Sequence, residues 1–439
     1  MTSVSPPTPT RPAVHFVTMG CPKNEVDSDR MAASLDPSFR LVDDLDAADV
    51  AVVNTCAFIR EATEESIDVV LALTGEWKAA RPGRTVIVSG CMPARYGSDL
   101  AAAMPEVDAF VPVAEEENLA RVVAGLTGID LVCAPIASAR RAPGPSAYVQ
   151  VSDGCHRRCT FCTIPDIRGD YVSRPLPEVV AEARLLVAGG ARELVLVGQD
   201  VSSWGRDLPG APVLADLVRE VARVEDLRWL RLMYVQPDGI TPGLLETMAS
   251  EPAVCRYLDM PLQHASRSVL RRMARSGDAA EFLRLIGVVR DLLPGVFLRT
   301  TLISGFPGET REDAQRLADF LRDADLDYAG VFAYSAEEGT PAAELDGQIS
   351  ARTRSARAQR LRDVAFDIGT AKAASLVGRT LEVLVEGVDE EGVAVGRHRG
   401  QAPEVDGLVL LDRAVRPGTL VEVEIVDTLG YDLVGEVRS

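Results

Sequence analysis

Apolar runs and amphipathic stretches alternate from residue 14 to about residue 130 of this 439-residue chain. Three of the runs are continuous and rich in β-branched side chains, which is typical of buried parallel strands: residues 14–20, 50–55 and 85–90. Successive runs are separated by about the length of one βαβ unit. This pattern predicts an open α/β domain with a parallel sheet over residues 13–133.

The alternation stops at residues 134–145, a stretch rich in proline and arginine that we interpret as a linker, and then restarts. Six further apolar strand candidates follow, most of them separated by amphipathic helical stretches: residues 148–151, 194–197, 229–235, 257–260, 297–303 and 328–332. This arrangement predicts an incomplete, six-stranded relative of the eight-stranded (β/α) barrel over residues 146–374. The site of such a barrel lies at the carboxyl ends of its strands.

From residue 376 the pattern changes to short alternating strands divided by glycines and by Pro417-Gly418. This change predicts a small antiparallel β-barrel over residues 375–439. Residues 1–12, rich in proline and threonine, are predicted to be a flexible tail. The expected fold class is therefore α/β, with an open parallel-sheet domain, a central partial (β/α)6 barrel and a terminal β-barrel.

Three cysteines occupy equivalent positions in the first domain. Cys21, Cys56 and Cys91 each follow one of the apolar runs, at a constant spacing of 35 residues. Because parallel strands joined by right-handed crossovers end at the same edge of a sheet, we expect these thiols to meet and to hold a metal cluster. The alternative is three separate buried cysteines that act as small apolar residues.

A second set, Cys155, Cys159 and Cys162, has the spacing C-x3-C-x2-C. A structural zinc site has four protein ligands, so three cysteines do not complete one. Complete ligation of a four-iron cube also takes four cysteines, so three thiolates leave one iron without a protein ligand. The alternative is three unrelated cysteines in a loop. The remaining two, Cys133 and Cys255, lack thiol neighbours in the sequence and are expected to be inert buried residues.

Composition limits the partners and the compartment. Eight cysteines, six of them in two sets, do not make a secreted disulfide scaffold, and this favours a reduced cytoplasmic location. Neither a signal peptide nor an apolar run of membrane-spanning length is present, so no membrane partner is expected. The net charge of −19 disfavours nucleic acid as a main partner. It favours a basic protein instead.

Charge also separates two local features. The region from Leu376 to Ser439 has thirteen acidic residues and six arginines. A module of this charge is expected to repel RNA and to attract a basic protein. The arginine-rich stretch over residues 352–362 is interpreted as a solvated helix face that balances the preceding acids, with a substrate contact as the alternative.

The motifs together resemble a known family. Gly154 and the C-x3-C-x2-C run, followed by Arg168-Gly169, are similar to the signature of radical S-adenosylmethionine (SAM) enzymes, and the terminal barrel looks like a TRAM module. With the first three-cysteine set, nearly the whole chain resembles the methylthiotransferases. Further matches to their RimO-type branch are residues 20–24, 198–200, 261–266, 305–309 and 338–341.

The RimO-type branch modifies an aspartate of protein S twelve of the small ribosomal subunit, whereas the other main branch modifies an adenosine in transfer RNA. The latter typically has Gln-Met where this chain has Pro22-Lys23. One departure from the RimO-type pattern is Asp29, where the family more often has glutamate. Both residues are acidic, so the expected function is unchanged.

The resemblance implies two [4Fe-4S] clusters and two SAM molecules. The cluster on Cys155, Cys159 and Cys162 would cleave one SAM to a radical that abstracts the aspartate β-hydrogen. The cluster on the other three cysteines would hold an added sulfur, which the second SAM methylates before transfer to the carbon radical. An unactivated C–H bond needs such cofactor chemistry, because side-chain acids and bases cannot break it.

Six residues are expected to contact SAM or to shield its cluster. Glu193 sits where this class often receives the SAM amino group, and Gly305 and Glu309 lie in a glycine-rich turn suited to close backbone approach. A plain strand-to-helix turn is the alternative for the glycines. Gln199 and Gln263 fall at barrel strand ends, and Phe161 lies inside the cysteine motif. His264 is interpreted as a structural, hydrogen-bonded histidine.

The implied partners are a basic ribosomal protein as substrate, recognised by the acidic C-terminal domain, and an electron donor such as flavodoxin or ferredoxin. RNA is not expected to be the primary substrate. Two rival functions remain at this point: a transfer-RNA adenosine methylthiotransferase, and a non-enzymatic iron–sulfur electron carrier or redox sensor. The carrier has no use for two clusters that each lack a protein ligand.

Overall fold

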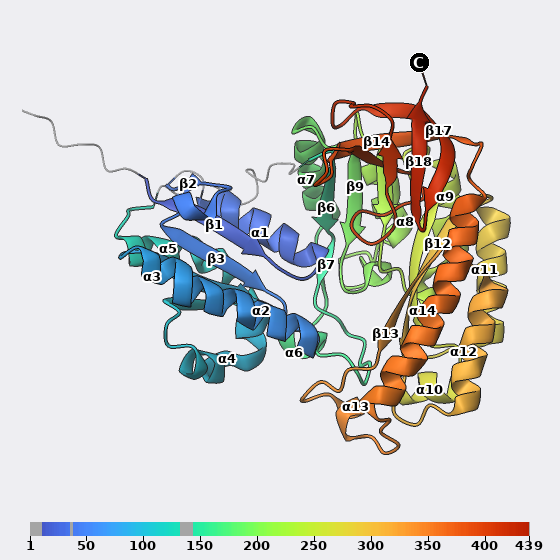
Figure 1. Ribbon diagram of the computed structural model, residues 1–439, viewed down its shortest axis with the longest axis horizontal. Helices are drawn as coiled ribbons and strands as arrows, with labels where there is room; N and C mark the ends of the chain where they lie inside the picture. The colour runs from blue at the N-terminus through green and yellow to red at the C-terminus, as the bar shows by residue number, and fades with distance from the viewer. Residues whose placement is uncertain (1–10, 36–37, 132–143, 439) are drawn as a thin grey trace, which may run out of the picture. The chain divides into compact units, whose positions relative to one another are not determined.

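The computed structural model describes residues 11–35, 38–131 and 144–438, and Figure 1 shows its elements. The chain forms two compact units. The first comprises Met1–Arg141 together with the short segment Asp166–Arg168, and the second comprises Ala142–Pro165 and Gly169–Ser439. Nearly all of the predicted tail and linker, and Cys133, lie outside the described residues.

The first unit contains a five-stranded parallel sheet of order β2-β1-β3-β4-β5. Its central strand is buried at every position, as its apolar sequence predicts. The strands are β1 (Ala13–Thr18), β2 (Arg40–Leu41), β3 (Val50–Thr55), β4 (Thr85–Gly90) and β5 (Ala109–Pro112). The main helices are α1 (Pro22–Leu35), α2 (Arg60–Ala72), α4 (Cys91–Ala103) and α5 (Leu119–Thr127). The predicted open α/β domain is confirmed.

The second unit begins with six parallel strands in two sheets, β10-β9-β6 and β11-β12-β13. A parallel bridge between Leu230 and Val254 lies where the chain passes from one sheet to the other. The strands are β6 (Ser146–Gln150), β9 (Glu193–Val197), β10 (Trp229–Leu232), β11 (Tyr257–Gln263), β12 (Phe297–Ser304) and β13 (Tyr328–Ala333). The predicted six-stranded partial barrel is confirmed.

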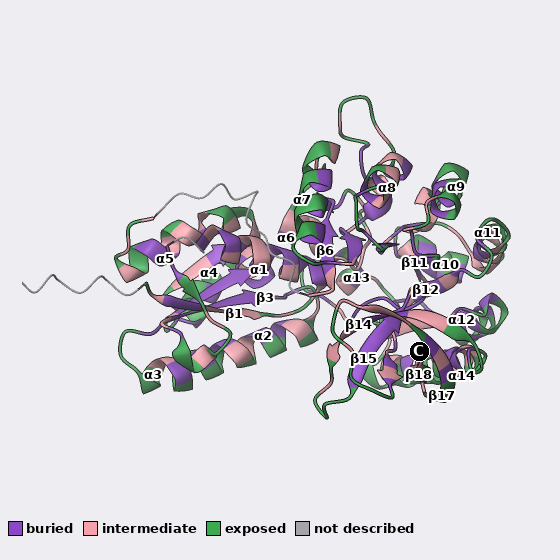
Figure 2. Ribbon diagram, turned by 90° about the horizontal axis from the view of Figure 1, so that it is seen from above, coloured by how far each residue is buried: buried purple, intermediate pink, exposed green. Residues whose placement is uncertain are grey.

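Helices surround this partial barrel with their apolar faces inward. Figure 2 shows exposed residues on the outer sides of the helices and buried residues facing the strands. The helices are α7 (Leu176–Ala188), α8 (Leu214–Ala222), α9 (Pro242–Ser250), α11 (Ala279–Leu292), α12 (Arg311–Ala324) and α14 (Ala351–Ala374). The shorter α6 (Ile164–Arg168), α10 (Arg267–Arg272) and α13 (Pro341–Glu344) lie in the connections. No helix in the described part of the chain is both long and apolar enough to span a bilayer.

The C-terminal strands close into a five-stranded barrel of order β14-β15-β16-β18-β17. They are β14 (Thr380–Val388), β15 (Ala394–His398), β16 (Val409–Leu411), β17 (Leu420–Leu429) and β18 (Asp432–Val437). The predicted barrel is confirmed with one correction, because β16 and β18 pair in parallel. The strands expected from the sequence, residues 380–385, 392–395, 408–411 and 420–427, omit β18, which only Gly430 and Tyr431 separate from β17.

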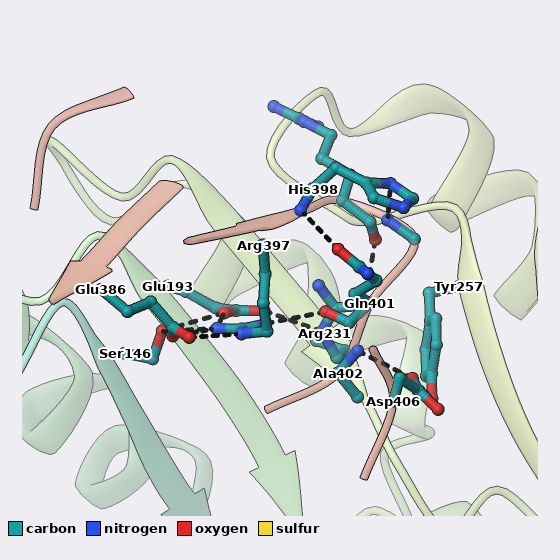
Figure 3. Close-up of polar contacts among 12 residues, drawn as sticks. Ser146, Glu193, Arg231, Tyr257, Glu386, Arg397, His398, Gln401, Ala402 and Asp406 are labelled. Atoms are coloured by element: carbon teal, nitrogen blue, oxygen red, sulfur yellow. Dashed lines mark hydrogen bonds and ion pairs between the residues drawn. The ribbon is translucent and has the colours of Figure 1, made fainter. Parts of the chain in front are cut away.

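The two barrels of the second unit are joined by buried polar contacts and belong to one compact unit. Arg397 of β15 is paired with Glu193, the first residue of β9. Trp229, the first residue of β10, donates its indole N–H to Glu382 at 3.1 Å. Figure 3 shows the polar contacts around Glu193 and Arg397 at this junction. The terminal barrel therefore packs on the amino ends of the strands.

Titration of this interface gives a stability prediction. Burial, helped by Arg231 and Arg397, lowers the pKa of His398 to about 3 from 6.5. Between pH 6.5 and about pH 3, His398 is therefore protonated in the unfolded chain but neutral in the folded chain. Protonation thus favours the unfolded chain, and the free energy of unfolding decreases as pH falls through this range. In the wild type, His398 should lower the free energy of unfolding by roughly 1.4 kcal/mol for each pH unit between pH 6 and 4. We expect H398Q to lack this contribution when stability is measured by urea unfolding.

A neighbouring carboxyl acts in the opposite direction and serves as an internal comparison. Burial raises the pKa of Asp406 to about 6 from 3.8. The folded chain therefore gains a proton first, and this group favours folding as pH falls from 6 to 3.8. As pH falls, the free energy of unfolding should decrease more steeply in D406N than in the wild type. It should decrease less steeply in H398Q. Equal slopes in wild type and H398Q would contradict the assignment.

Candidate active site

The three N-terminal cysteines lie at the carboxyl edge of the first sheet. Strands β1, β3 and β4 are adjacent and parallel, and the register pairs Thr55 with Gly90. Cys56 and Cys91 each come one residue later, so they leave the sheet at matching positions. Cys21 follows β1 through the turn Met19-Gly20. The topology thus brings the predicted set to one place.

A shared amide contact limits how far apart two of these thiols can be. The Sγ atoms of Cys21 and Cys91 lie 3.8 and 4.0 Å from the same atom, Oδ1 of Asn24. The two sulfurs are therefore no farther apart than the sum of these distances. Asn24 is itself held by its amide N–H groups, which donate to the carbonyls of Met19 and Thr55.

Two glycines allow the backbone to pack closely around Cys56. Gly20 has φ +95°, and a Cβ built there would lie 2.5 Å from Cys56 Cβ and 2.9 Å from its Sγ. Gly90 also has φ +95°, and its added Cβ would lie 2.2 Å from Oδ1 of Asn54. Any side chain at Gly20 or Gly90 would displace the segments that carry the cysteines.

The buried guanidinium of Arg168 faces this edge from the segment assigned to the first unit. It donates to Asn24 Oδ1 at 3.0 Å and to Asp27 Oδ2 at 2.8 Å. Burial raises the pKa of the Cys91 thiol to about 12, and the positive charge of Arg168 opposes that rise. Burial likewise raises the pKa of Cys56. A cluster needs thiolates, so a buried cation beside them favours its assembly.

This arrangement gives a prediction for Arg168. R168M should break the buried ion pair with Asp27, which costs about 3–5 kcal/mol, and should weaken cluster binding as well. We expect anaerobically reconstituted R168M to hold about four irons rather than about eight. The double variant R168M/D27N removes both charges of the pair, so restored folding without restored iron would separate the two effects. Full iron content in R168M would contradict the role.

The second cysteine set lies in the loop that follows β6 and the short strand β7 (Ser152–Asp153). Backbone contacts fix this loop: Cys162 N–H donates to the Cys159 carbonyl at 3.1 Å, and Thr160 N–H donates to the Met273 carbonyl at 3.2 Å. The Arg157 side chain holds the loop to the carboxyl end of β9 through Asp200, at 2.6 Å. The loop is thus anchored on elements distant in sequence.

Donors also point at two of these sulfurs. The backbone N–H of Arg157 donates to Cys155 Sγ at 3.3 Å, and Arg275 Nη1 lies 3.9 Å from Cys159 Sγ. Hydrogen bonds and positive charge at cluster sulfurs are among the means by which proteins set cluster potentials. Burial raises the pKa of the Cys155 thiol. The donor set therefore fits a thiolate-bound iron–sulfur cluster.

No three His, Cys, Asp or Glu side chains within the described ranges converge as ligands of a single metal ion. A single-ion site brings all its ligands to one atom, whereas a cube spreads its thiolates over different irons. The thiols of each set can therefore stand apart and still suit a cube. Their assignment as cluster ligands remains a prediction.

Polar side chains with open hydrogen-bonding atoms gather at the carboxyl ends of the barrel strands. Both amide atoms of Gln199, Oε1 of Gln236, Oε1 of Gln263 and Oγ of Ser304 are buried and have no partner among the described residues. They follow β9 and β10 and end β11 and β12. Buried polar atoms are normally satisfied, so this group fits a polar ligand such as SAM.

The backbone at two of these strand ends is strained. Gln263 has φ +70° and Tyr234 has φ +59°, in the left-handed region that non-glycine residues rarely occupy. The register of β11 also shifts between Met260 and Gln263. Such strain concentrates at functional sites. The register shift moves the residues at the end of β11 out of the regular strand pattern.

The expectation that Glu193 meets the amino group of SAM is not supported by its contacts. Glu193 is the first residue of β9, at the amino end of the barrel, and is fully buried. Arg231 and Arg397 pair with its two carboxylate oxygens. Although burial alone would raise the pKa of Glu193, these arginines hold it at about 2. Its contacts are those of an interface residue between the two barrels.

Glu309 is also occupied by protein groups. Its carboxylate accepts from Gly305 N–H at 2.7 Å, Arg357 Nη1 at 2.6 Å and His264 Nε2 at 3.3 Å. Since His264 Nδ1 accepts from Ser266 N–H, its Nε2 carries the proton, as expected for a structural histidine. Glu309 therefore fixes the turn at Gly305, which a direct SAM contact by this carboxylate would disturb.

Phe161, inside the cysteine motif, packs edge-on against Phe306 with ring centroids 6.4 Å apart. This contact fits the predicted shielding role. Cys255 is fully buried, and burial raises the pKa of its thiol to about 11, which agrees with an inert residue. The arginine stretch lies on α14. Its Arg357 pairs with Glu309 rather than with the acids of residues 337–346 that we expected it to balance.

Three regions of the chain match described families. Residues 149–321 match the radical SAM superfamily, residues 13–112 match an uncharacterised protein family named UPF0004, and residues 377–437 match the TRAM domain. The ribosomal protein uS12 methylthiotransferase RimO of Geobacter sulfurreducens is 41% identical, with 97% of this chain and 98% of that protein aligned. This chain belongs to the RimO family. The RimO of Sorangium cellulosum is 43% identical, with 97% and 90% aligned.

Solved structures agree on the fold of this RimO-family chain. The radical SAM methyltransferase TsrM of Kitasatospora setae, solved with cobalamin and a [4Fe-4S] cluster, has a TM-score of 0.55 at 15% identity, covering 85% of this chain and 77% of its own. The cobalamin-dependent radical SAM enzyme OxsB has a TM-score of 0.52 at 11% identity, covering 81% and 56%. At these identities the likeness concerns the fold alone.

Several residues of the RimO-family site carry little signal in the sequence. Gln236 stands four residues beyond β10, and no motif contains it. Asn24 and Arg168 lie inside motifs, but nothing in their spacing indicates that they meet at the cysteine edge. The pair Arg157–Asp200 also escapes prediction, although a basic residue inside a cysteine motif and an acid at a strand end are both visible.

Proposed function

We propose that this chain transfers a methylthio group to the β-carbon of an aspartate in ribosomal protein uS12. The observation that carries the proposal is the presence of two three-cysteine sets, each where parallel strands end, in a chain of the RimO family. The name of its relatives specifies the substrate protein. A ribosomal substrate and free cysteines also favour a cytoplasmic location.

Cys155, Cys159 and Cys162 would hold one [4Fe-4S] cluster, and Cys21, Cys56 and Cys91 the other. Bound there, the clusters and SAM supply a radical able to remove an unactivated hydrogen and a methylated sulfur to replace it. The pair Arg157–Asp200 keeps the second cysteine loop at the strand ends. Arg168 offers positive charge to the first set.

The open polar atoms at the barrel mouth would bind and orient SAM. Gln199, Gln263 and Ser304 come from different strands, so together they can fix a ligand in position and direction. Phe161 and Phe306 place apolar rings beside the cysteine motif and help to exclude water. Glu309 holds the adjoining turn through Gly305.

Recognition of the basic substrate is assigned to the terminal barrel. Two of its six arginines, Arg397 and Arg399, donate hydrogen bonds to residues of the central barrel. The other four arginines are exposed, and they are outnumbered by seven exposed acids, so the outer surface keeps a negative excess: Glu390, Glu391, Glu404, Asp412, Glu422, Asp427 and Glu436. Such a surface attracts a basic ribosomal protein and disfavours RNA phosphates.

The test is an anaerobic reaction of the reconstituted chain with SAM, sulfide, dithionite and purified uS12. Mass spectrometry should find a gain of about 46 Da, the mass of CH2S, on one aspartate. Transfer RNA incubated in parallel should stay unmodified. Modified transfer RNA with unchanged uS12 would overturn the proposal and favour the other branch of the methylthiotransferases.

A further inference from the structure

A groove lined by arginines lies on the outside of the central barrel, between α12 and α14. It has a volume of about 1000 Å³, and its lining contains the exposed Arg311, Arg316, Arg352 and Arg360. We call this surface the arginine groove. Arg311 and Arg352 belong to the first turns of α12 and α14, so the groove begins at the end of the barrel where the strands finish.

Most of the positive charge in the arginine groove is not neutralised. Arg357 pairs with Glu309, and Arg316 lies 4.0 Å from Asp313. Arg311, Arg352 and Arg360 have no carboxylate within 4.0 Å among the residues that the structure describes. In a chain of net charge −19, such a patch marks one place where an acidic protein is attracted rather than repelled.

A line of contacting side chains leads from α14, the helix that carries Arg352 and Arg360 of the groove, to the second cysteine set. Its first member, Arg354, is not itself in the groove lining. The Arg354 guanidinium of α14 lies 5.5 Å from the centroid of the Tyr334 ring. Tyr334 contacts Phe306 at 5.1 Å between ring centroids, and Phe306 contacts Phe161 at 6.4 Å. Phe161 stands between Cys159 and Cys162. A donor bound at the groove would therefore contact the same helix from which packed aromatic side chains lead toward the cluster thiols.

We infer that the arginine groove docks the one-electron donor for SAM cleavage, a small acidic flavin or iron–sulfur protein. This inference rests on the proposed function. Each cleavage consumes one electron: the donor is oxidised by one electron, the sulfonium of SAM accepts it through the cluster, and the S–C5′ bond breaks to methionine and a 5′-deoxyadenosyl radical. Nothing in the chain itself supplies that electron, so the donor must bind.

The groove is less suited to RNA. Its lining includes Glu312 and Asp319 among the arginines and has no aromatic side chain on which a base could stack. Mixed charge with a positive excess suits an acidic protein surface that also carries some basic groups. The groove is also separate from the acidic surface of the terminal barrel, which is assigned to the substrate.

The experiment compares R311E/R352E/R360E with the matched control R121E/R184E/R284E, which changes the charge equally at exposed arginines of α5, α7 and α11. Two of the groove substitutions place glutamate in the first turn of a helix, where it is favourable. Reduced flavodoxin, and in a second arm reduced ferredoxin, are the probes. Binding is measured at low salt, and 5′-deoxyadenosine release is measured with each donor and with dithionite.

We expect the groove variant to bind the donors at least about tenfold more weakly and to lose donor-driven release by a similar factor. Dithionite-driven release and uS12 methylthiolation should stay within about twofold of wild type, and the control should retain all four readouts. Unchanged donor binding, or lost dithionite-driven release, would overturn the inference.

The dithionite arm keeps the fate of the groove separate from that of the proposed function. Intact uS12 modification with dithionite would leave the proposed function standing even if the groove does not bind a donor. A ribosomal RNA fragment provides a further probe. If the groove variant loses binding to this RNA while its donor binding is intact, the groove is an RNA-binding surface and the inference is wrong.

Discussion

Replacing Cys91 with alanine is expected to abolish methylthio transfer while 5′-deoxyadenosine release continues. Cys91 is buried at the edge where Cys56 also leaves the sheet, and its sulfur shares an amide contact with Cys21. Loss of a ligand should exceed the 10- to 100-fold effect of losing an outer partner, so modified uS12 should fall at least about a hundredfold. The second cysteine set is untouched by this change.

The readouts are modified uS12 by mass spectrometry and 5′-deoxyadenosine by chromatography from the same reaction. C155A should lose both products, because its set is the one assigned to SAM cleavage. C255A is the matched control: its thiol is equally buried but has no predicted ligand role, so both products should persist. Wild-type levels of modified uS12 from C91A would contradict a sulfur-carrying site at this edge.

Replacing Arg397 with methionine should strongly destabilise the second unit. The side chains of Arg397, Glu193 and Arg231 are fully buried, and removal of one partner leaves the Glu193 carboxylate short of a cation. Breaking a buried pair in this way costs about 3–5 kcal/mol. Urea unfolding followed through tryptophan fluorescence suits the test, because Trp229 donates to Glu382 at the same interface.

Two variants make this result specific. E193Q/R397M removes both charges of the pair and should recover part of the loss, since contacting residues are not additive. R438M breaks the surface pair with Glu424 and should cost less than about 1 kcal/mol. R397M with wild-type stability would show that the two barrels are held together by other contacts. Because the pKa of Glu193 is about 2, its stabilisation should persist above pH 4.5 and be lost as pH falls through 2.

The strands are predictable from the sequence because burial patterns are local. The runs before Cys56 and Cys91 form strands that are almost entirely buried, and the six-stranded partial barrel follows from the same kind of signal. Strand β18 escapes prediction because only a two-residue turn separates it from β17. The parallel pairing of β16 and β18 depends on barrel closure, which no local pattern encodes.

The site is harder to predict than the fold. The local sequence places Glu193 near SAM, yet its contacts are with arginines 38 and 204 positions away. Glu309 likewise stands in a motif that suggests a ligand contact, but Arg357 and His264 occupy its oxygens. A carboxylate at a plausible position can be saturated by distant partners. Only the tertiary structure shows which polar atoms remain open.

The iron content of C155A/C159A/C162A, reconstituted anaerobically, decides whether the chain carries a second cluster. We predict about four irons per chain, with the Mössbauer spectrum of a [4Fe-4S] cluster, held by Cys21, Cys56 and Cys91. Adding C21A, C56A and C91A should then reduce the iron to none. A triple variant that holds no iron while remaining folded would contradict a second cluster, and with it the proposed route of sulfur to the substrate.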